Sequence, residues 1–138
     1  MAEITHRRVA TNGIELHVAE AGQGRPVVLC HGFPESWYSW RHQLPALADA
    51  GYRALAPDQR GYGDSSLPGE VTDYGIRALC EDLLGLLDDI GERRAIFVGH
   101  DWGALIVWDL ARLYPERVDA VVGVSVPFFR PRVPPTQL

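Results

Sequence analysis

Short apolar segments alternate with segments of helical spacing along most of the chain, and this alternation restricts the possible folds more than any other feature. Residues 27–30 and 95–98 are continuously apolar, residues 118–126 are mostly apolar, and residues 52–57 form a fourth strand-like segment. Short apolar runs are typical of strands covered on both faces. Because helical segments lie between them, we predict an α/β fold with a mostly parallel sheet and helices on its faces.

The remaining segments carry start and stop signals. Residues 6–11 and 14–20 alternate about Asn12 and Gly13, which predicts an antiparallel hairpin. Apolar spacing predicts three helices, over 36–50 before Gly51, from the cap Asp73 to Gly91, and over 104–114 before Pro115. Regular structure is excluded near the end of the chain by Pro127, Pro131, Pro134 and Pro135.

The composition argues against several classes of function. The 138 residues suit one compact domain, and a net charge of −5 without a basic stripe argues against nucleic-acid binding. No apolar run approaches the roughly 20 residues that span a bilayer, and no secretory signal is evident, so we expect a cytoplasmic protein without a membrane partner. Cys30 and Cys80 are predicted to be packed, reduced thiols. Without a cysteine or histidine cluster at ligand spacing, we expect no metal and no cofactor.

Three unusual stretches follow predicted strands, at residues 31–37, 58–66 and 99–103. Ligands of open α/β sheets gather at the carboxyl ends of the strands. The third stretch runs from Gly99 to Gly103 between a strand and a helix, the setting of the G-x-S-x-G turn that exposes a nucleophile. Asp101 takes the central position, where it is either a nucleophile or a helix cap, and the glycines suit a turn too tight for a Cβ.

The first stretch, His31-Gly32-Phe33-Pro34, follows the strand whose loop supplies an oxyanion-hole N–H in hydrolases of this type. We therefore expect the backbone N–H groups of Phe33 and Trp102 to point at one spot. We interpret His31 as a buried histidine that braces the loop, in preference to a general base. In the second stretch we expect Asp58 and Arg60 to tie the loop down near the turn from Gly99 to Gly103.

Together the stretches HGFPESWYSWR, DQRGYGDSS and GHDWGA resemble the epoxide hydrolase family of the α/β-hydrolase superfamily. The resemblance implies that the chain is the N-terminal part of an α/β-hydrolase fold, with a partial core at 1–126 and a proline-rich tail at 127–138 where a cap domain begins. It also implies site residues: Asp101 as nucleophile, Phe33 and Trp102 as oxyanion hole and substrate contacts, Glu35 near the cavity to place water, and His31, Gly32, Pro34, Gly99, His100 and Gly103 in support.

Asp suits an epoxide substrate because the opening step is a displacement at an sp³ carbon, which a carboxylate performs without a base. The product is an ester of Asp101. Water activated by a histidine then attacks the ester carbonyl, and the oxyanion hole serves this second step. The resemblance further implies that tyrosines of the cap protonate the epoxide oxygen. The expected partner is a small epoxide or a similar apolar electrophile.

All five histidines precede Asp101, and no later acid suits the relay position, since Asp109 lies in a helix and Glu116 and Asp119 flank the start of a strand. In this fold the order is nucleophile, acid, histidine. We therefore expect an incomplete site that is alkylated without turnover. We also expect strand 118–126 to be an exposed apolar edge that favours self-association or a complementary C-terminal fragment.

Two other functions compete with this interpretation. A protein like the haloalkane dehalogenases also carries Asp followed by Trp, and the Trp102 indole would then hold the halide; Phe33 supplies no side-chain donor for it. The second alternative is a truncated, non-catalytic fragment. Aromatic residues that could line an apolar pocket, but that more often belong to a core, are Trp37, Tyr38, Trp40 and Phe128.

Overall fold

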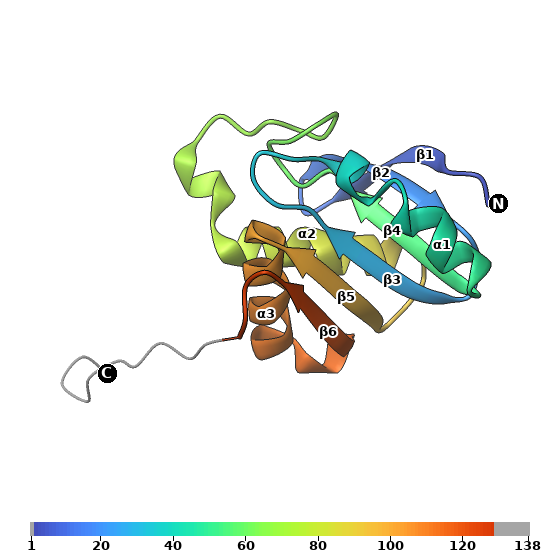
Figure 1. The fold of residues 1–138 in the computed structure, drawn as a ribbon. Helices are drawn as coiled ribbons and strands as arrows, with labels where there is room; N and C mark the ends of the chain where they lie inside the picture. The colour runs from blue at the N-terminus through green and yellow to red at the C-terminus, as the bar shows by residue number, and fades with distance from the viewer. Residues whose placement is uncertain (1, 129–138) are drawn as a thin grey trace.

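Six strands form one sheet in the order β1-β2-β4-β3-β5-β6 (Figure 1). The structure is a computed structural model, and it describes residues 2–128. The strands are β1 (Thr5–Thr11), β2 (Ile14–Ala21), β3 (Arg25–Cys30), β4 (Tyr52–Pro57), β5 (Ala95–His100) and β6 (Val118–Val124). Their pairing is antiparallel from β1 to β4 and parallel from β4 to β6, so the predicted hairpin and parallel sheet are both present.

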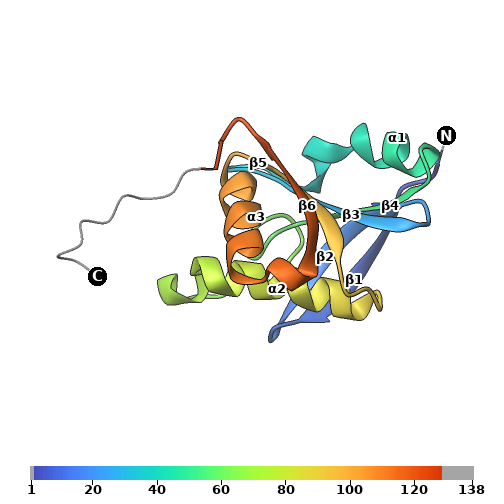
Figure 2. The same cartoon turned by 90° about the horizontal axis from the view of Figure 1, so that it is seen from below.

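Helices cover the two faces of the sheet unequally, as Figure 2 shows. Helices α2 (Ile76–Asp89) and α3 (Trp102–Leu113) pack on one face, where they bury the larger cluster around Leu55, Phe97 and Leu110. Helix α1 (Gln43–Asp49) packs on the other face, over the small residues of β2 and β4. None of the helices in the described part of the chain is long and apolar enough to cross a membrane.

The predicted single helix over 36–50 is wrong. The chain forms a 3₁₀ turn, η1 (Trp37–Trp40), and then the separate helix α1 from Gln43. Pro45 explains the break, because in a continuous helix its ring would clash with the carbonyl of Arg41 and its nitrogen could donate no hydrogen bond. As the third residue of α1, Pro45 sits where an N–H would have no helical partner in any case. Gly51 ends α1 at a φ of 94°, as predicted.

The predicted role of Asp73 as the cap of α2 is also wrong. Asp73 lies inside a 3₁₀ turn, η2 (Val71–Tyr74), where its carboxylate accepts a hydrogen bond from the Glu70 backbone N–H at 3.1 Å. Helix α2 begins after Gly75, whose backbone is extended. The hydrogen bond of Asp73 therefore belongs to the 3₁₀ turn η2, which precedes α2, and not to the start of α2.

Strand β6 is an edge of the sheet and is shorter than predicted, since it ends at Val124 before Ser125, whose φ is 71°. Gly123 packs against the Trp108 ring of α3. Val122 and Val124 therefore point to the opposite face, where they are 49% and 41% exposed. Helix α1 does not cover this end of the sheet. Among the described residues, the apolar strip of β6 that Val122 and Val124 form is therefore uncovered. Of the predicted proline-rich tail, residues 129–138 lie outside the described residues.

Candidate active site

A sharp turn joins β5 to α3 at Asp101. The Asp101 backbone has a φ of 58° and a ψ of −120°, a combination that residues other than glycine rarely adopt. Such strained backbone persists only where the surroundings hold it. Here the helix start holds it, because the Ala104 N–H donates to the Asp101 carbonyl at 3.0 Å. The side chain of Asp101 is therefore lifted away from both strand and helix.

Three glycines allow this turn because neighbouring backbones approach each other closely. A Cβ at Gly99 would lie 2.3 Å from the Gly103 carbonyl oxygen, and a Cβ at Gly103 would lie 2.1 Å from the Cys30 carbonyl oxygen. A Cβ at Gly32 would lie 2.6 Å from the Cβ of Asp101. Any side chain at these positions would force the backbone apart. The glycines thus bring the loop after β3 into contact with the turn after β5.

Backbone N–H groups surround the Asp101 carboxylate. The Phe33 N–H donates to its Oδ2 at 3.1 Å. The N–H groups of Phe33 first and Trp102 second favour the ionised form and hold the pKa of Asp101 below its usual value, with a smaller contribution from His100. The side chain is consequently an ionised carboxylate at neutral pH. The assignment of the Phe33 and Trp102 amides to an oxyanion hole stays a prediction, and both amides act on the charge of this one carboxylate.

His31 is buried, and both of its ring nitrogens are engaged. Its Nδ1 lies 2.9 Å from the Gly32 carbonyl oxygen, and its Nε2 accepts the Gln59 N–H at 3.1 Å. The Gln59 side chain returns a bond to the His31 carbonyl at 2.6 Å. Burial lowers the pKa of His31, so the ring is neutral. This arrangement matches a bracing histidine, because neither nitrogen is free to accept a proton from water.

Asp58 and Arg60 anchor the 58–66 loop through partners outside the turn from Gly99 to Gly103. Asp58 accepts a bond from His17 Nδ1 at 2.7 Å and from the Trp37 N–H at 2.8 Å. Arg60 forms a two-pronged ion pair with Asp82 of α2, with both N–O distances at 2.7 Å. Asp58 and Arg60 thus hold the loop through partners on β2, η1 and α2, and the loop lies beside the turn, since Gln59, Arg60 and Tyr62 line a cavity together with Trp102.

A cavity of about 460 Å³ opens beside Asp101. Most of its lining is apolar or aromatic: His31, Gly32, Phe33, Gln59, Arg60, Tyr62, Tyr74, Leu79, Trp102 and Ile106. The side chains of Phe33 and Trp102 are 60% and 55% exposed and stand at its mouth. Trp37, Tyr38, Trp40 and Phe128 are not among the lining residues. A small apolar molecule would reach Asp101 from this side.

Tyr62 is a lining residue that the sequence did not single out. Its ring packs edge-on against His31 at 5.1 Å and against Phe33 at 6.4 Å between centroids. Burial, and then the charge of Asp101, raises the pKa of its hydroxyl. The only sequence signal for Tyr62 was its place in a loop that follows a strand at the carboxyl edge of the sheet.

Glu35, which was expected near the cavity, pairs with His100. Its Oε1 lies 3.3 Å from His100 Nδ1, and its Oε2 accepts a bond from the Ser39 hydroxyl. Glu35 is absent from the cavity lining and precedes η1. Pro34 is exposed and follows a cis peptide bond. Glu35 therefore lies next to the turn that carries Asp101, since a Cβ on Gly32 would lie 2.7 Å from Glu35 Oε1 and 2.6 Å from the Asp101 Cβ.

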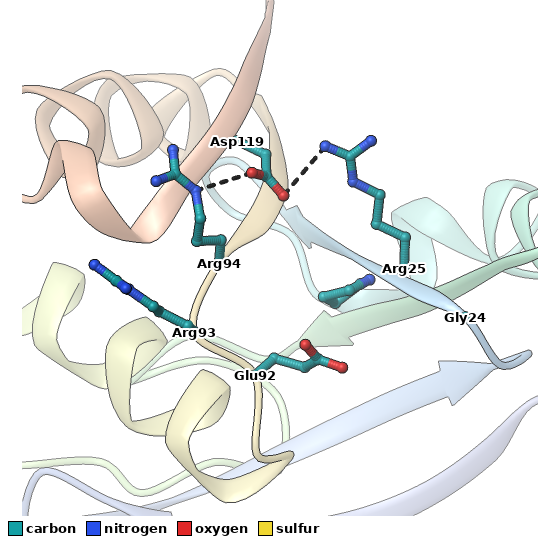
Figure 3. Close-up of a pocket in the computed structure, with 7 residues that line it drawn as sticks. Gly24, Arg25, Glu92, Arg93, Arg94 and Asp119 are labelled. Atoms are coloured by element: carbon teal, nitrogen blue, oxygen red, sulfur yellow. Dashed lines mark hydrogen bonds and ion pairs between the residues drawn. The ribbon is translucent and has the colours of Figure 1, made fainter.

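A second cavity lies at the other end of the strands (Figure 3). Asp119 binds Arg94 at 2.9 Å and Arg25 at 3.2 Å there, and the side chain of Arg93 points along the same rim (Figure 3). Arg25 begins β3, whereas Gly32 and Phe33 follow the end of that strand. This cavity is thus separated from Asp101 by the full length of the sheet, and its ion pairs are structural.

Comparison with known proteins agrees with these features. The sequence profile of the alpha/beta hydrolase fold family matches residues 25–136. Epoxide hydrolase A of Mycobacterium tuberculosis is 60% identical over 140 residues, covering 99% of this chain and 44% of the relative. Bifunctional epoxide hydrolase 2 of Sus scrofa is 51% identical over 128 residues, covering 91% of this chain and 23% of the relative.

Solved structures give the same result. Epoxide hydrolase A from Mycobacterium thermoresistibile superposes with a TM-score of 0.91 at 57% identity, over 98% of this chain and 43% of that one. Epoxide hydrolase VrEH1 from Vigna radiata has a TM-score of 0.91 at 50% identity, over 97% of this chain and 45% of that one. The chain thus spans less than half the length of the relatives it matches.

Proposed function

The chain belongs to the alpha/beta hydrolase fold family, and on that premise we propose that it performs the chemistry of an epoxide hydrolase, with Asp101 as the nucleophile. One observation carries the proposal: an ionised carboxylate stands at a strained turn beside an apolar cavity, held by the backbone N–H groups of Phe33 and Trp102. The names of the most similar relatives support the same substrate class.

In the first step a carboxylate oxygen of Asp101 attacks one ring carbon of the epoxide. A C–O bond forms, the ring C–O bond breaks, and its electron pair goes to the epoxide oxygen, which takes a proton from water and leaves hydroxide. The lowered pKa of Asp101 keeps the attacking group ionised. The apolar lining, with Phe33, Leu79 and Ile106, favours an epoxide with an apolar substituent.

In the second step hydroxide adds to the carbonyl carbon of the Asp101 ester. Negative charge then develops on the carbonyl oxygen, and the Phe33 and Trp102 N–H groups are suited to stabilise it. Collapse of this intermediate restores the carboxylate and releases the diol. The same two donors therefore serve both steps, first on the free carboxylate and then on the oxyanion.

A base for the second step is missing among the five histidines of the described residues. His31 has both nitrogens engaged, and His100 faces Glu35. His6 and His17 contact each other on the hairpin, and His42 precedes α1. For a polypeptide of these 138 residues we propose that the reaction stops at the ester. The missing base also supports the proposed domain division, in which a partial core extends to residue 126 and a cap domain begins after it.

The test is mass spectrometry after incubation with styrene oxide. We expect one epoxide mass added per chain, mapped by proteolysis to the peptide that contains Asp101, and less than one equivalent of diol. The matched control is Asp101→Asn, since Asn has the same shape as Asp and keeps one oxygen that can accept the Phe33 N–H. No adduct, or an adduct elsewhere, would contradict the nucleophile and favour a non-catalytic protein. Steady diol production would contradict the incomplete second step.

The exposed Trp102 side chain supports a second candidate, a haloalkane-dehalogenase-like reaction, because its indole N–H could hold a departing halide beside Asp101. Phe33 offers no second side-chain donor, so we favour the epoxide. Incubation with 1-chlorobutane decides between them: chloride release with alkylation of Asp101, and no styrene oxide adduct, would reverse the preference.

The uncovered strip of β6 supports a proposal about partners. Val122 and Val124 are apolar and exposed on an edge strand, which favours pairing with another chain. We propose that this edge takes a complementary C-terminal polypeptide or a second copy of the chain. Analytical ultracentrifugation, with Val122→Lys as the variant, tests this: the variant is expected to shift the chain toward monomer. A wild-type chain that stays monomeric would contradict self-association.

A further inference from the structure

The cavity beside Asp101 is mostly apolar, and most of the polar side chains in its wall are bonded to the protein. The Gln59 side chain donates to the His31 carbonyl at 2.6 Å, and both ring nitrogens of His31 are engaged. Arg60 is paired with Asp82. Pockets of this kind orient a ligand through a few well-placed polar groups. The donors that are not bonded to the protein therefore decide how a ligand lies in this cavity.

The two tyrosines in the wall differ in this respect. The Tyr74 hydroxyl donates to the Pro68 carbonyl at 2.5 Å and is therefore occupied. The Tyr62 hydroxyl makes no hydrogen bond with the residues that the structure describes. The same is true of the Trp102 indole N–H, but that side chain is 55% exposed at the mouth of the cavity. Tyr62 is half-buried, so its hydroxyl is the donor in the wall that a ligand can use.

The loop that carries Tyr62 holds its ring in one position. Tyr62 stands between two glycines at positive φ, Gly61 at 86° and Gly63 at 52°. A Cβ at Gly61 would lie 2.7 Å from the Tyr74 ring. A Cβ at Gly63 would overlap the buried Asp58 carboxylate. The backbone of Tyr62 also closes two hydrogen bonds within the loop, at 2.9 Å from its N–H and at 3.1 Å to its carbonyl. A ligand therefore loses little free energy in ordering this side chain.

The Tyr62 ring also lies next to the residue that binds the Asp101 carboxylate. It packs edge-on against the Phe33 ring, with 6.4 Å between the centroids and 84° between the planes. The Phe33 N–H donates to Asp101 Oδ2 at 3.1 Å. Burial, and then the charge of Asp101, raises the pKa of the Tyr62 hydroxyl, which therefore stays protonated at neutral pH. A hydrogen-bond donor and a carboxylate thus belong to the same cavity.

From this arrangement we propose that Tyr62 is a substrate-binding residue whose hydroxyl donates a hydrogen bond to the oxygen of an epoxide held against Asp101. The inference rests on the proposed function, because it assigns a donor to the first step. As the Asp101 carboxylate attacks one ring carbon and the ring C–O bond breaks, negative charge develops on the epoxide oxygen. A donor that faces this charge stabilises the transition state more than the bound epoxide. Tyr62 keeps its own proton, and the proton that the oxygen takes up comes from water.

The rate at which styrene oxide alkylates Asp101 in the full chain tests the proposal, with Tyr62→Phe as the variant. This change removes the hydroxyl and keeps the ring with its edge-on contacts. We expect the maximal rate to fall at least about ten-fold, because the developing oxyanion loses a donor, and the half-saturating concentration to change less. Tyr38→Phe is the matched control, because Tyr38 is exposed and lies outside the cavity lining. Its rate should equal that of the unmodified chain.

A second electrophile separates an effect on the epoxide oxygen from an effect on the shape of the cavity. Benzyl bromide alkylates a carboxylate without forming an oxygen anion, so Tyr62→Phe should leave its rate at Asp101 unchanged. Equal slowing of both reagents, or an unchanged rate with styrene oxide, would overturn the role of Tyr62 and leave the nucleophile in place. Absence of any styrene oxide adduct at Asp101 in the unmodified chain would contradict the proposed function itself, and the role of Tyr62 with it.

Discussion

Two aspartates lie at the same edge of the sheet, and their surroundings differ. Asp58 follows β4 and Asp101 follows β5, and both carboxylates accept backbone N–H groups. Asp58 is 1% exposed and is also bound to a histidine side chain, on a loop held further by the Arg60–Asp82 pair. Asp101 stands at positive φ beside a cavity. Hydrogen bonding alone therefore does not distinguish a structural carboxylate from a candidate nucleophile; backbone strain and access do.

The strongest test of this difference is Asp101→Asn. We expect alkylation by styrene oxide to fall to the level measured in a sample without styrene oxide, because an amide is a poor nucleophile. Stability should change little, since Asn has the same shape as Asp and keeps one oxygen that can accept the Phe33 N–H. Mass spectrometry and urea unfolding measure the two effects. Undiminished alkylation would mean that another group attacks the epoxide.

The reciprocal change is Asp58→Ala. It leaves His17 without its carboxylate and two N–H groups without an acceptor, so we expect a loss of about 3–5 kcal/mol in the free energy of unfolding. Urea unfolding measures it. Alkylation of the folded fraction at Asp101 should persist. A stability close to that of the unmodified chain would show that solvent replaces Asp58, and the contrast between the two aspartates would fail.

A smaller effect is expected from Gly103→Ala, which puts a Cβ 2.1 Å from the Cys30 carbonyl oxygen. Overpacking of this kind costs about 1–3 kcal/mol. Gly69→Ala is the matched control, because a Cβ at Gly69 meets nothing within 4 Å and its φ is not positive. Thermal unfolding of the two variants should differ by several degrees. Equal melting temperatures would show that the turn after β5 can relax.

The smallest effect concerns pH. The pKa of Asp101 is lowered, first by the Phe33 N–H, so its contribution to stability is complete above the unfolded pKa, about 3.9, and is lost as the pH falls through the folded value. The ¹³C signal of the Asp101 carboxyl should therefore titrate at lower pH in the folded chain than in urea. Coincident titrations would remove the proposed effect of the two amides.

The sequence was sufficient for features that depend on neighbouring residues. The strands were predicted from apolar runs, the hairpin from the Asn12–Gly13 turn, and the turn at Asp101 from the glycines beside it. Each of these signals acts within a few residues. The break before α1 was missed because apolar spacing was given more weight than Pro45. Features that join distant segments were also missed, since packing alone brings them together: Arg60 with Asp82, Glu35 with His100, and His17 with Asp58.

The position of β3 between β4 and β5 has a consequence for how the two aspartate loops are joined. The three residues that follow β3, from His31 to Phe33, bridge them: His31 accepts the Gln59 N–H on one side, and Phe33 donates to Asp101 on the other. The bridge has a fixed length. One residue inserted between His31 and Phe33 would leave each loop intact and yet carry the amide out of reach of the carboxylate. The length of this segment is therefore restricted, whereas the side chain of Phe33 can vary without loss of the bridge, because its contact with Asp101 uses only the backbone N–H.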